Sequence, residues 1–383
     1  MRLSKRSDVD AFIVMDVMEA AARAEASGRH IIHMEVGQPG TPAPIGARRA
    51  LADAMDRGAL GYTVALGLPE LRAKIAALYG TRYDLDLSPS RVIVTAGSSG
   101  AFLLAFTALF EAGDRVALGA PGYPSYRQIL SALSLTPVDI PTRLEDRHQP
   151  TPETLPDNIQ GLIAASPANP TGTMLDGPAL TALIEATAAK GASFVSDEIY
   201  HGLEYGQRAV SALEVTDDVY VINSFSKYFS MTGWRVGWMV VPEDHVRTIE
   251  RLAQNMFICA PHASQVAALA AMECDAELQA NIDVYKTNRA LMLKGLDAAG
   301  FDRIAPPDGA FYVYADVSEL TTNARAFAAE ILAQAGVAVT PGLDFDKARG
   351  QGTLRFSYAR STDDIEEGLS RLKTFMVAKG FVD

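Results

Sequence analysis

The sequence is poor in cysteine, and it carries less positive than negative charge. Two cysteines among 383 residues are too few for a disulfide framework, so we expect free thiols and a reducing compartment, the cytoplasm. Lysine and arginine number 34 against 46 aspartates and glutamates, which gives a formal net charge of -12. Because nucleic acid and anionic membranes bind clustered cationic surface, this balance argues against both as partners.

The sequence also lacks a long hydrophobic run. Near the N-terminus, the apolar stretch Ala11–Met15 is short and is bounded by Asp10 and Asp16, so it predicts neither a signal peptide nor a membrane span. The chain is 48% hydrophobic and 21% charged, which is typical of a soluble globular protein with a sizeable core.

Short apolar runs alternate with helical patterns in the middle of the chain. This alternation predicts an α/β fold with a mostly parallel sheet and crossover helices. The expected strands are 91–95, 115–119, 136–140, 161–165, 193–196, 219–223 and 236–241. Residues 243–300 read as helical with a break at 259–261, and a strand, helix, strand, helix order follows. We therefore expect a large domain at 45–285 and a smaller α+β domain made of 1–44 and 286–383.

Polar residues follow five of the expected strands, at the edge where open parallel sheets bind ligands. These segments are "TAGSSGA" (95–101), "APGYPSY" (120–126), "SPANPTG" (166–172), "DEIYHG" (197–202) and "SFSK" (224–227). "GSSG" at 97–100 is either an ordinary turn or a phosphate site at a helix N-terminus, which Arg235 and Ser224 could complete.

Two charged residues in these segments also have two interpretations each. Asp197 ends a buried strand, so it is either half of a structural ion pair or the partner of a bound cation. Lys227 is either a surface lysine or a lysine tuned for covalent chemistry. Taken together, the five segments call for a phosphate, a cationic ring nitrogen, an aromatic plane against Tyr123 and an electrophilic carbon near Lys227. Pyridoxal phosphate has all four.

Three motifs then point to a family. "NPTG", "SDEIY" and "SFSKYFSMTGWRVGW" place Asn169, Asp197 and Lys227 in order, 28 and then 30 positions apart. With "MEVGQPGTPAP", "GYTVALGLPELR" and "LRFSYA", the chain resembles the class I/II aminotransferases of fold type I over almost its whole length, in the subgroup of bacterial aspartate and aromatic aminotransferases. The resemblance implies pyridoxal 5'-phosphate as cofactor, and a large domain with a mostly parallel seven-stranded sheet plus a smaller α+β domain. It also implies ping-pong transfer of an amino group between an L-amino acid and a 2-oxo acid.

The resemblance also implies individual roles. Lys227 would hold the cofactor as a Schiff base and, once freed, move the substrate proton as general base and acid. Asp197 would pair with the pyridine nitrogen, Asn169 and Tyr200 would bind the ring oxygen, and Tyr123 would stack on the ring. Further residues match the phosphate site and the site of the substrate α-carboxylate: Ser98, Ser99, Gly100, Ser224 and Arg235 for the phosphate, and Gly37, Asn169 and Arg355 for the carboxylate.

Tyr62, in "GYTVALG", matches a tyrosine that reaches the phosphate of the neighbouring subunit. The resemblance therefore implies a homodimer with shared active sites.

The substrate side chain is left open by the sequence. Some relatives place a lysine where this chain has Ser99, which puts a dicarboxylate substrate in doubt. Four apolar residues near the expected entrance are compatible with hydrophobic or aromatic donors and equally with ordinary packing: Phe12, Ile13, Phe225 and Phe311.

Three other functions stay as alternatives. A C–S β-lyase would use the same cofactor residues, and a non-catalytic protein would bind the cofactor or an effector. A metal site is weakly indicated by "DEIYHGLE" (197–204), because the six histidines of the chain show no second cluster, so no metal ligand is assigned.

Overall fold

A seven-stranded sheet forms the centre of the computed structural model, which describes all residues from 1 to 383. Its strands, in the order β2-β8-β7-β6-β5-β3-β4, are β2 (Val92–Thr95), β8 (Gly237–Val240), β7 (Tyr220–Ser224), β6 (Ser193–Asp197), β5 (Gly161–Ala165), β3 (Arg115–Ala120) and β4 (Thr136–Pro141). Only β8 runs against its neighbours, β2 and β7; the other pairs are parallel. The predicted mostly parallel seven-stranded sheet is confirmed.

Both faces of this sheet are covered, which is why its central strands carry buried apolar side chains on both faces. Successive side chains of a strand point to opposite faces. On β2, Val92 and Val94 join one buried cluster, whereas Ile93 joins another. The covering helices are α3 (Pro69–Tyr83), α4 (Gly97–Leu109), α5 (Pro124–Ala132), α6 (Gly177–Ala189), α7 (Val246–Met256) and α8 (His262–Ala271), and α2 (Ile45–Arg57) packs on α8.

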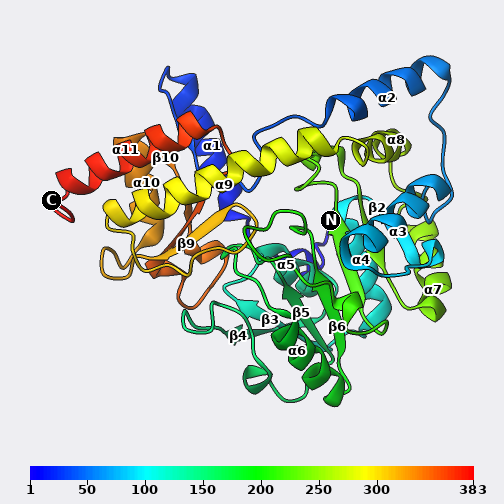
Figure 1. Cartoon of the computed structure of the whole chain (residues 1–383). Helices are drawn as coiled ribbons and strands as arrows, with labels where there is room; N and C mark the ends of the chain where they lie inside the picture. The colour runs from blue at the N-terminus through cyan, green and yellow to red at the C-terminus, as the bar shows by residue number, and fades with distance from the viewer.

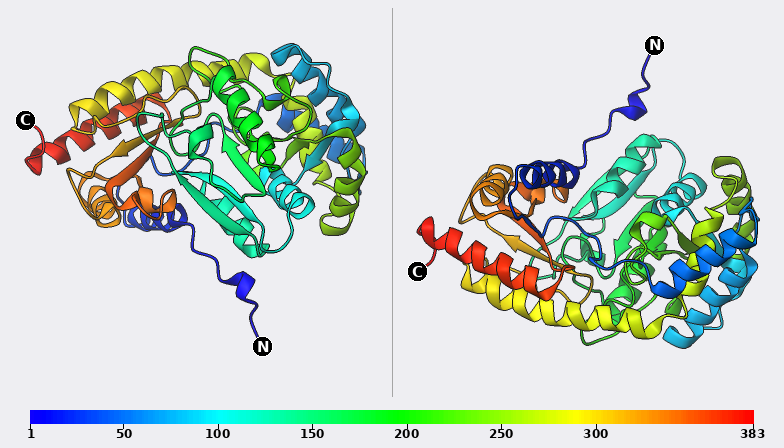
Figure 2. Two further views of the ribbon diagram at one scale, coloured as in Figure 1. Left: turned by 90° about the horizontal axis from the view of Figure 1, so that it is seen from below. Right: turned by 90° about the horizontal axis from the view of Figure 1, so that it is seen from above.

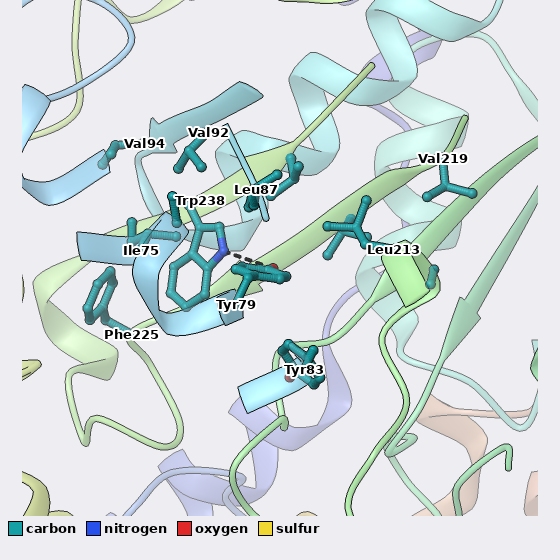
Figure 3. Close-up of a cluster of buried hydrophobic side chains, with 14 of the residues drawn as sticks. Ile75, Tyr79, Tyr83, Leu87, Val92, Val94, Leu213, Val219, Phe225 and Trp238 are labelled. Atoms are coloured by element: carbon teal, nitrogen blue, oxygen red, sulfur yellow. Dashed lines mark hydrogen bonds between the residues drawn. The ribbon is translucent and has the colours of Figure 1, made fainter. Parts of the chain in front are cut away.

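Trp238 on β8 anchors one of these clusters, as Figure 3 shows. Its indole nitrogen donates a hydrogen bond to the hydroxyl oxygen of Tyr79 on α3 at 3.2 Å. The ring of Phe225 packs edge-on against it, with ring centroids 5.1 Å apart. Because Phe225 lies two residues before Lys227, this packing fixes the start of the loop that carries the lysine.

The chain ends build a second, smaller group of elements. A three-stranded antiparallel sheet has the order β11-β12-β9, and β1 pairs in parallel with β10. The strands and helices of this smaller group are β1 (Ile32–His33), β9 (Tyr312–Asp316), β10 (Val337–Ala338), β11 (Thr340–Pro341), β12 (Thr353–Ser357), α1 (Ile13–Ala26), α10 (Ala324–Ala335) and α11 (Thr362–Ala378). They enclose a separate core with residues such as Ile32, Phe301 and Phe356.

The long helix α9 (Asp275–Ala298) runs from the side of α8 to the side of α10 and α11 (Figure 1). The break expected at 259–261 lies between α7 and α8, and a further break separates α8 from α9 at 272–274. In both views of Figure 2 the N-terminal end of the chain projects from the body of the protein, whereas Asp10 and Phe12, just before α1, contact it. None of the helices combines the length and the apolar composition that a membrane crossing needs.

Candidate active site

A cavity of about 430 Å³ lies at the carboxyl ends of β5, β6 and β7, opposite β9 and β12 of the smaller group. Most of the side chains singled out in the sequence line it. They are Gly37, Ser98, Ser99, Tyr123, Asn169, Asp197, Tyr200, Lys227, Arg235 and Arg355. Residues up to 318 positions apart therefore meet in one place, as expected for strand ends at a common edge.

Lys227 follows β7 and points into this cavity. Its Nζ donates a hydrogen bond to the backbone oxygen of Gly37 and lies 5.6 Å from the ring centroid of Tyr200. Burial lowers the pKa of Lys227 to about 7, and the positive charges of Arg355 and Arg235 act in the same direction. The amine is therefore available as a nucleophile and as a base near neutral pH.

Asp197 is the last residue of β6 and is buried without an ion-pair partner among the lysines and arginines. The hydroxyl of Tyr126 donates to its Oδ2, and the backbone N–H of Ile199 donates to its Oδ1 at 3.1 Å. Burial raises the pKa of Asp197 to about 6, while these two hydrogen bonds lower it. A buried carboxylate in this setting is suited to a cationic ligand atom.

Ser98 and Ser99 lie in the first turn of α4, beside Arg235. Gly97 has a φ of +72°, and a Cβ there would come within 2.4 Å of Nη2 of Arg235, so only glycine lets the guanidinium approach the helix start. Nη1 of Arg235 donates to the backbone oxygen of Thr232 at 2.9 Å. Hydroxyls, a helix N-terminus and a guanidinium in this arrangement are suited to bind an anion.

Arg355 lies in the middle of β12 and is buried. Its Nη1 donates to Oδ1 of Asn169 at 2.9 Å, and its Nη2 donates to the backbone oxygen of Glu35. The guanidinium carbon lies 4.5 Å from the ring centroid of Tyr312 and 4.7 Å from that of Phe345. Its buried Nε has no partner within the protein, which leaves a donor for a ligand carboxylate.

Two tyrosines of the site were missed by the sequence reasoning. Tyr126 binds Asp197, and its ring meets that of Tyr123 edge-on with centroids 5.2 Å apart. The hydroxyls of Tyr312 and Tyr200 are hydrogen-bonded at 2.8 Å. The spacing of three residues in "YPSY" at the start of a helix is a signal for Tyr126, because residues i and i+3 share a helix face. For Tyr312 the close approach of Gly37 is visible only in three dimensions, where a Cβ at Gly37 would lie 2.0 Å from the hydroxyl oxygen.

Three residues expected at the cofactor do not line the cavity. Ser224 lies behind Ser226, whose hydroxyl it meets at 2.8 Å, and it donates to the backbone oxygen of Val236 at 3.1 Å. Gly100 is buried within α4. Tyr62 is 82% exposed, so within one chain it reaches no cofactor site.

Of the four apolar residues expected near the entrance, only one lines the cavity. Phe12 lines the cavity, whereas Ile13 does not. Phe225 and Phe311 are both completely buried in the cores, so for these two the packing interpretation applies.

The acidic residues near His201 do not converge on a metal position. Glu198 accepts hydrogen bonds from the hydroxyl of Ser211 and from the backbone N–H of Ala212. His201 lies between the hydroxyl of Tyr83 and the backbone oxygen of Ser166, at 2.6 and 2.8 Å. No group of three or more histidine, cysteine, aspartate or glutamate side chains has an arrangement suited to a metal ion.

The comparisons with known proteins agree with this geometry. The model of the family "Aminotransferase class I and II" matches residues 29–372. The chain belongs to this family. The aminotransferase is 46% identical over 382 residues to a Mycobacterium tuberculosis protein named valine–pyruvate aminotransferase, and the alignment covers 98% of each chain.

Solved structures agree as well. A crystal structure of a Silicibacter pomeroyi protein is 70% identical, with a TM-score of 0.95, covering 99% of this aminotransferase and 100% of that chain. The aspartate aminotransferase of Thermus thermophilus, solved with maleate, is 29% identical with a TM-score of 0.90, covering 98% and 100% of the two chains. The protein is thus an enzyme that transfers amino groups with pyridoxal phosphate, the cofactor of this family.

The residues of the cavity fit this cofactor. Lys227 offers an amine of near-neutral pKa for the aldehyde, and Asp197 is a buried carboxylate without a cation. The start of α4 with Arg235 offers an anion site for the phosphate. The spare Nε of Arg355 suits the carboxylate of an amino acid.

Proposed function

We propose that the amino donor is an L-amino acid with a small apolar side chain, such as valine, and that pyruvate serves as an acceptor. The single observation that carries this proposal is the apolar wall on one side of the cavity. It consists of Phe12, Val14, Met15, Met18 and Val36. The name of the M. tuberculosis relative supports the same choice.

The charges of the cavity also favour an apolar donor. A dicarboxylate such as aspartate carries a second carboxylate, which needs a cation of its own. The cationic side chains that line the cavity are Lys227, Arg235 and Arg355. Each of these cations is already assigned to another group: Lys227 to the cofactor aldehyde, Arg235 to the phosphate and Arg355 to the α-carboxylate. Ser99 also stands at the position where some relatives have a lysine.

For the chemistry, we assign the residues of the cavity as follows. Bound pyridoxal phosphate supplies an electron sink for the electrons that remain on the substrate when its α-proton leaves. Lys227 binds the cofactor and carries that proton, because its amine titrates near neutrality. Asp197 holds the positive charge of the ring nitrogen, and Asn169 with Tyr200 binds the ring oxygen.

The remaining residues bind the substrate α-carboxylate, the cofactor ring and the cofactor phosphate. Arg355 binds the substrate α-carboxylate, next to Asn169 and to the backbone of Gly37. Tyr123 stacks on the cofactor ring. The phosphate site comprises Ser98, Ser99, Gly100, Ser224 and Arg235, with Tyr62 of a second subunit.

We also propose a homodimer with shared sites. Tyr62 and Val64 belong to a loop whose Gly61 backbone oxygen meets Nδ1 of His262 at 2.8 Å. Tyr62, Val64, Met256 and Ile258 are 82%, 58%, 43% and 51% exposed, and such large apolar side chains favour a protein partner. Sedimentation of wild type and of Val64→Glu tests this: a monomeric wild type would contradict the dimer.

Two broader assignments complete the proposal. We assign residues 45–285 to the large domain and residues 1–44 with 286–383 to the small one. Two main buried cores support this division, although that of the small domain also takes in Tyr200 and Leu203, and α9 spans the boundary. Both cysteines, Cys259 and Cys274, are unpaired, which supports a cytoplasmic location.

The donor is tested with the purified enzyme loaded with pyridoxal phosphate. Valine, alanine, leucine, phenylalanine, aspartate and glutamate are each added, and the bleaching of the cofactor absorbance gives kcat/KM for each half-reaction. We expect the aliphatic donors to exceed aspartate by at least about 10-fold, because a hydrophobic pocket without a cation leaves the second carboxylate desolvated. A larger kcat/KM for aspartate than for valine would overturn the proposed donor.

A further inference from the structure

Helix α1 forms the apolar wall of the cavity. Phe12 directly precedes the helix, and Val14, Met15 and Met18 follow within its first two turns. The ring of Phe12 meets that of Tyr123 edge-on, with centroids 6.1 Å apart. The position of the first turn of α1 therefore decides how much space a substrate side chain has.

The sequence at this helix start provides no cap of its own. Phe12 occupies the N-cap position and has no side-chain acceptor, so the first backbone N–H groups of the helix need partners from elsewhere. Asp344 supplies them. The N–H of Ile13 donates to its Oδ1 at 2.9 Å, and the N–H of Val14 donates to its Oδ2 at 3.0 Å.

Asp344 belongs to the short 3₁₀ turn η7 (Gly342–Asp344), 330 residues away from Val14. Figure 2 shows α1, in blue, beside the orange elements of this part of the chain in both views. A carboxylate at a helix N-terminus also meets the positive end of the helix dipole, which adds to the two hydrogen bonds.

The residue after Asp344 touches two other walls of the site. The ring of Phe345 lies under the guanidinium of Arg355 at 4.7 Å, and its backbone oxygen accepts a hydrogen bond from the N–H of Gly122 at 3.0 Å. Gly122 directly precedes Tyr123. One turn of chain thus holds the apolar wall, the arginine of the carboxylate site and the loop of the stacking tyrosine in fixed relation.

We propose that Asp344 is a positioning residue that sets donor selectivity by fixing the first turn of α1 against the cavity. With both amides bound, Phe12 and Val14 present a rigid wall that favours a small aliphatic side chain. Without the carboxylate, the first turn loses its cap and the wall recedes, so that larger side chains enter. The inference rests on the proposed function only in the choice of valine as the reference donor.

The test compares kcat/KM for valine and for phenylalanine in the cofactor-loaded wild type, Asp344→Ala and Asp344→Asn. In Asp344→Ala we expect the valine-to-phenylalanine ratio to change in favour of phenylalanine by about 2- to 30-fold, the range that the loss of an N-cap allows. The change should lie in the KM values, with KM for phenylalanine falling relative to KM for valine, rather than in kcat. Asp344→Asn removes the charge and keeps one acceptor oxygen, while its amide nitrogen can only donate, so it can accept from only one of the two N–H groups. We expect its ratio to lie between those of wild type and Asp344→Ala.

The ratio separates positioning from a merely structural role, because a loss of folded enzyme lowers both values equally. A loss of charge beside Arg355 would raise KM for both donors equally, in Asp344→Asn as well as in Asp344→Ala. An unchanged ratio in Asp344→Ala overturns the inference. If that variant does not fold, Asp344→Ser serves in its place, because a serine hydroxyl at this position cannot bind both amides.

The failure of the proposed function is visible separately. If wild type alone prefers phenylalanine or aspartate to valine, the proposed donor is wrong, whereas the role of Asp344 is still decided by the difference between variant and wild-type ratios. Hydrogen exchange of the Ile13 and Val14 amides gives a readout independent of activity. We expect it to accelerate in Asp344→Ala, and unchanged protection would also overturn the inference.

Discussion

The hydroxyl of Tyr126 donates a hydrogen bond to Oδ2 of Asp197, and both residues line the cavity. This bond lowers the pKa of a carboxyl that burial raises to about 6. In Tyr126→Phe the pKa of Asp197 should rise further, so that less carboxylate faces the ring nitrogen at pH 7. We expect pyridoxal phosphate to bind about 10- to 150-fold more weakly, the range for a hydrogen bond to a charged group. Titration of the cofactor-free protein measures this.

The matched control for this change is Tyr123→Phe, which removes a hydroxyl from the neighbouring ring but keeps the bond to Asp197. Its cofactor affinity should stay within a few-fold of wild type. Equal affinities of wild type and Tyr126→Phe would show that the bond has no part in holding the cofactor.

The pKa of Lys227 predicts how fast the cofactor-free protein captures pyridoxal phosphate. Burial and the charges of Arg355 and Arg235 disfavour the ammonium form and lower the pKa to about 7. Only the neutral amine attacks an aldehyde, so the capture rate should rise with pH through a midpoint near 7. Stopped-flow absorbance between pH 5.5 and 9 follows it, and a rate that rises only above pH 9 would refute the prediction.

The pH dependence of the capture rate also tests, in a variant, whether a neighbouring positive charge lowers the pKa of Lys227. In Arg355→Met one of the two positive charges near Lys227 is absent, so the pKa of Lys227 should rise and the midpoint should move to higher pH. A midpoint that stays in place would mean that the charge of Arg355 does not contribute to the lowered pKa of Lys227.

Arg355→Lys tests the carboxylate site. Lysine keeps the charge but loses the planar fork that the guanidinium offers between Tyr312 and Phe345. We expect KM for the amino acid to rise about 10- to 150-fold, while the affinity for pyridoxal phosphate changes little. Arg289→Lys is the control, because Arg289 binds the backbone oxygen of Pro307 at 2.7 Å and does not line the cavity. A larger change in cofactor affinity than in KM would contradict the assignment.

The sequence predicted the positions of the strands and of the residues that follow them, because short apolar runs mark the strands. β5 has the predicted bounds 161–165, and β3, β4 and β6 begin at the predicted residues, because each of these strands contains a short apolar run between stretches of another character. Polar residues placed just after such strands had to meet at one edge of the sheet, which is why most of the candidate site lines one cavity.

Contacts between distant segments could not be predicted in this way. The cap of α1 comes from Asp344, and no local sequence pattern near Ile13 predicts a hydrogen-bond partner 331 positions away. Ser224 and Ser226 have identical side chains and lie two positions apart in the sequence. Only the three-dimensional path of the loop places Ser226 at the cavity wall and Ser224 behind it. Short strands such as β10 and β11, with two residues each, likewise depend on their partners rather than on a periodic pattern.

His201 predicts the acid stability of the cofactor-free protein. Burial lowers its pKa to about 3, and the positive charges of Arg82 and Arg208 contribute, so the folded state keeps this imidazole neutral. An unfolded histidine takes up a proton below pH ~6.5. Between these two values the unfolded state binds more protons than the folded state, so the free energy of unfolding decreases as the pH falls, by up to about 1.4 kcal/mol per pH unit for this group. His148, whose pKa burial lowers to about 4, acts in the same direction.

In His201→Gln this titration is absent, while the amide of glutamine still has a donor for the backbone oxygen of Ser166. The variant should be less stable than wild type at pH 7, because the bond to Tyr83 is altered, but it should lose stability less steeply between pH 7 and pH 5. Urea unfolding at both pH values gives the two slopes. Parallel slopes would show that His201 titrates at the same pH in the folded and the unfolded protein. The folded protein would then carry a charge at pH 5 beside Glu198, 3.5 Å away.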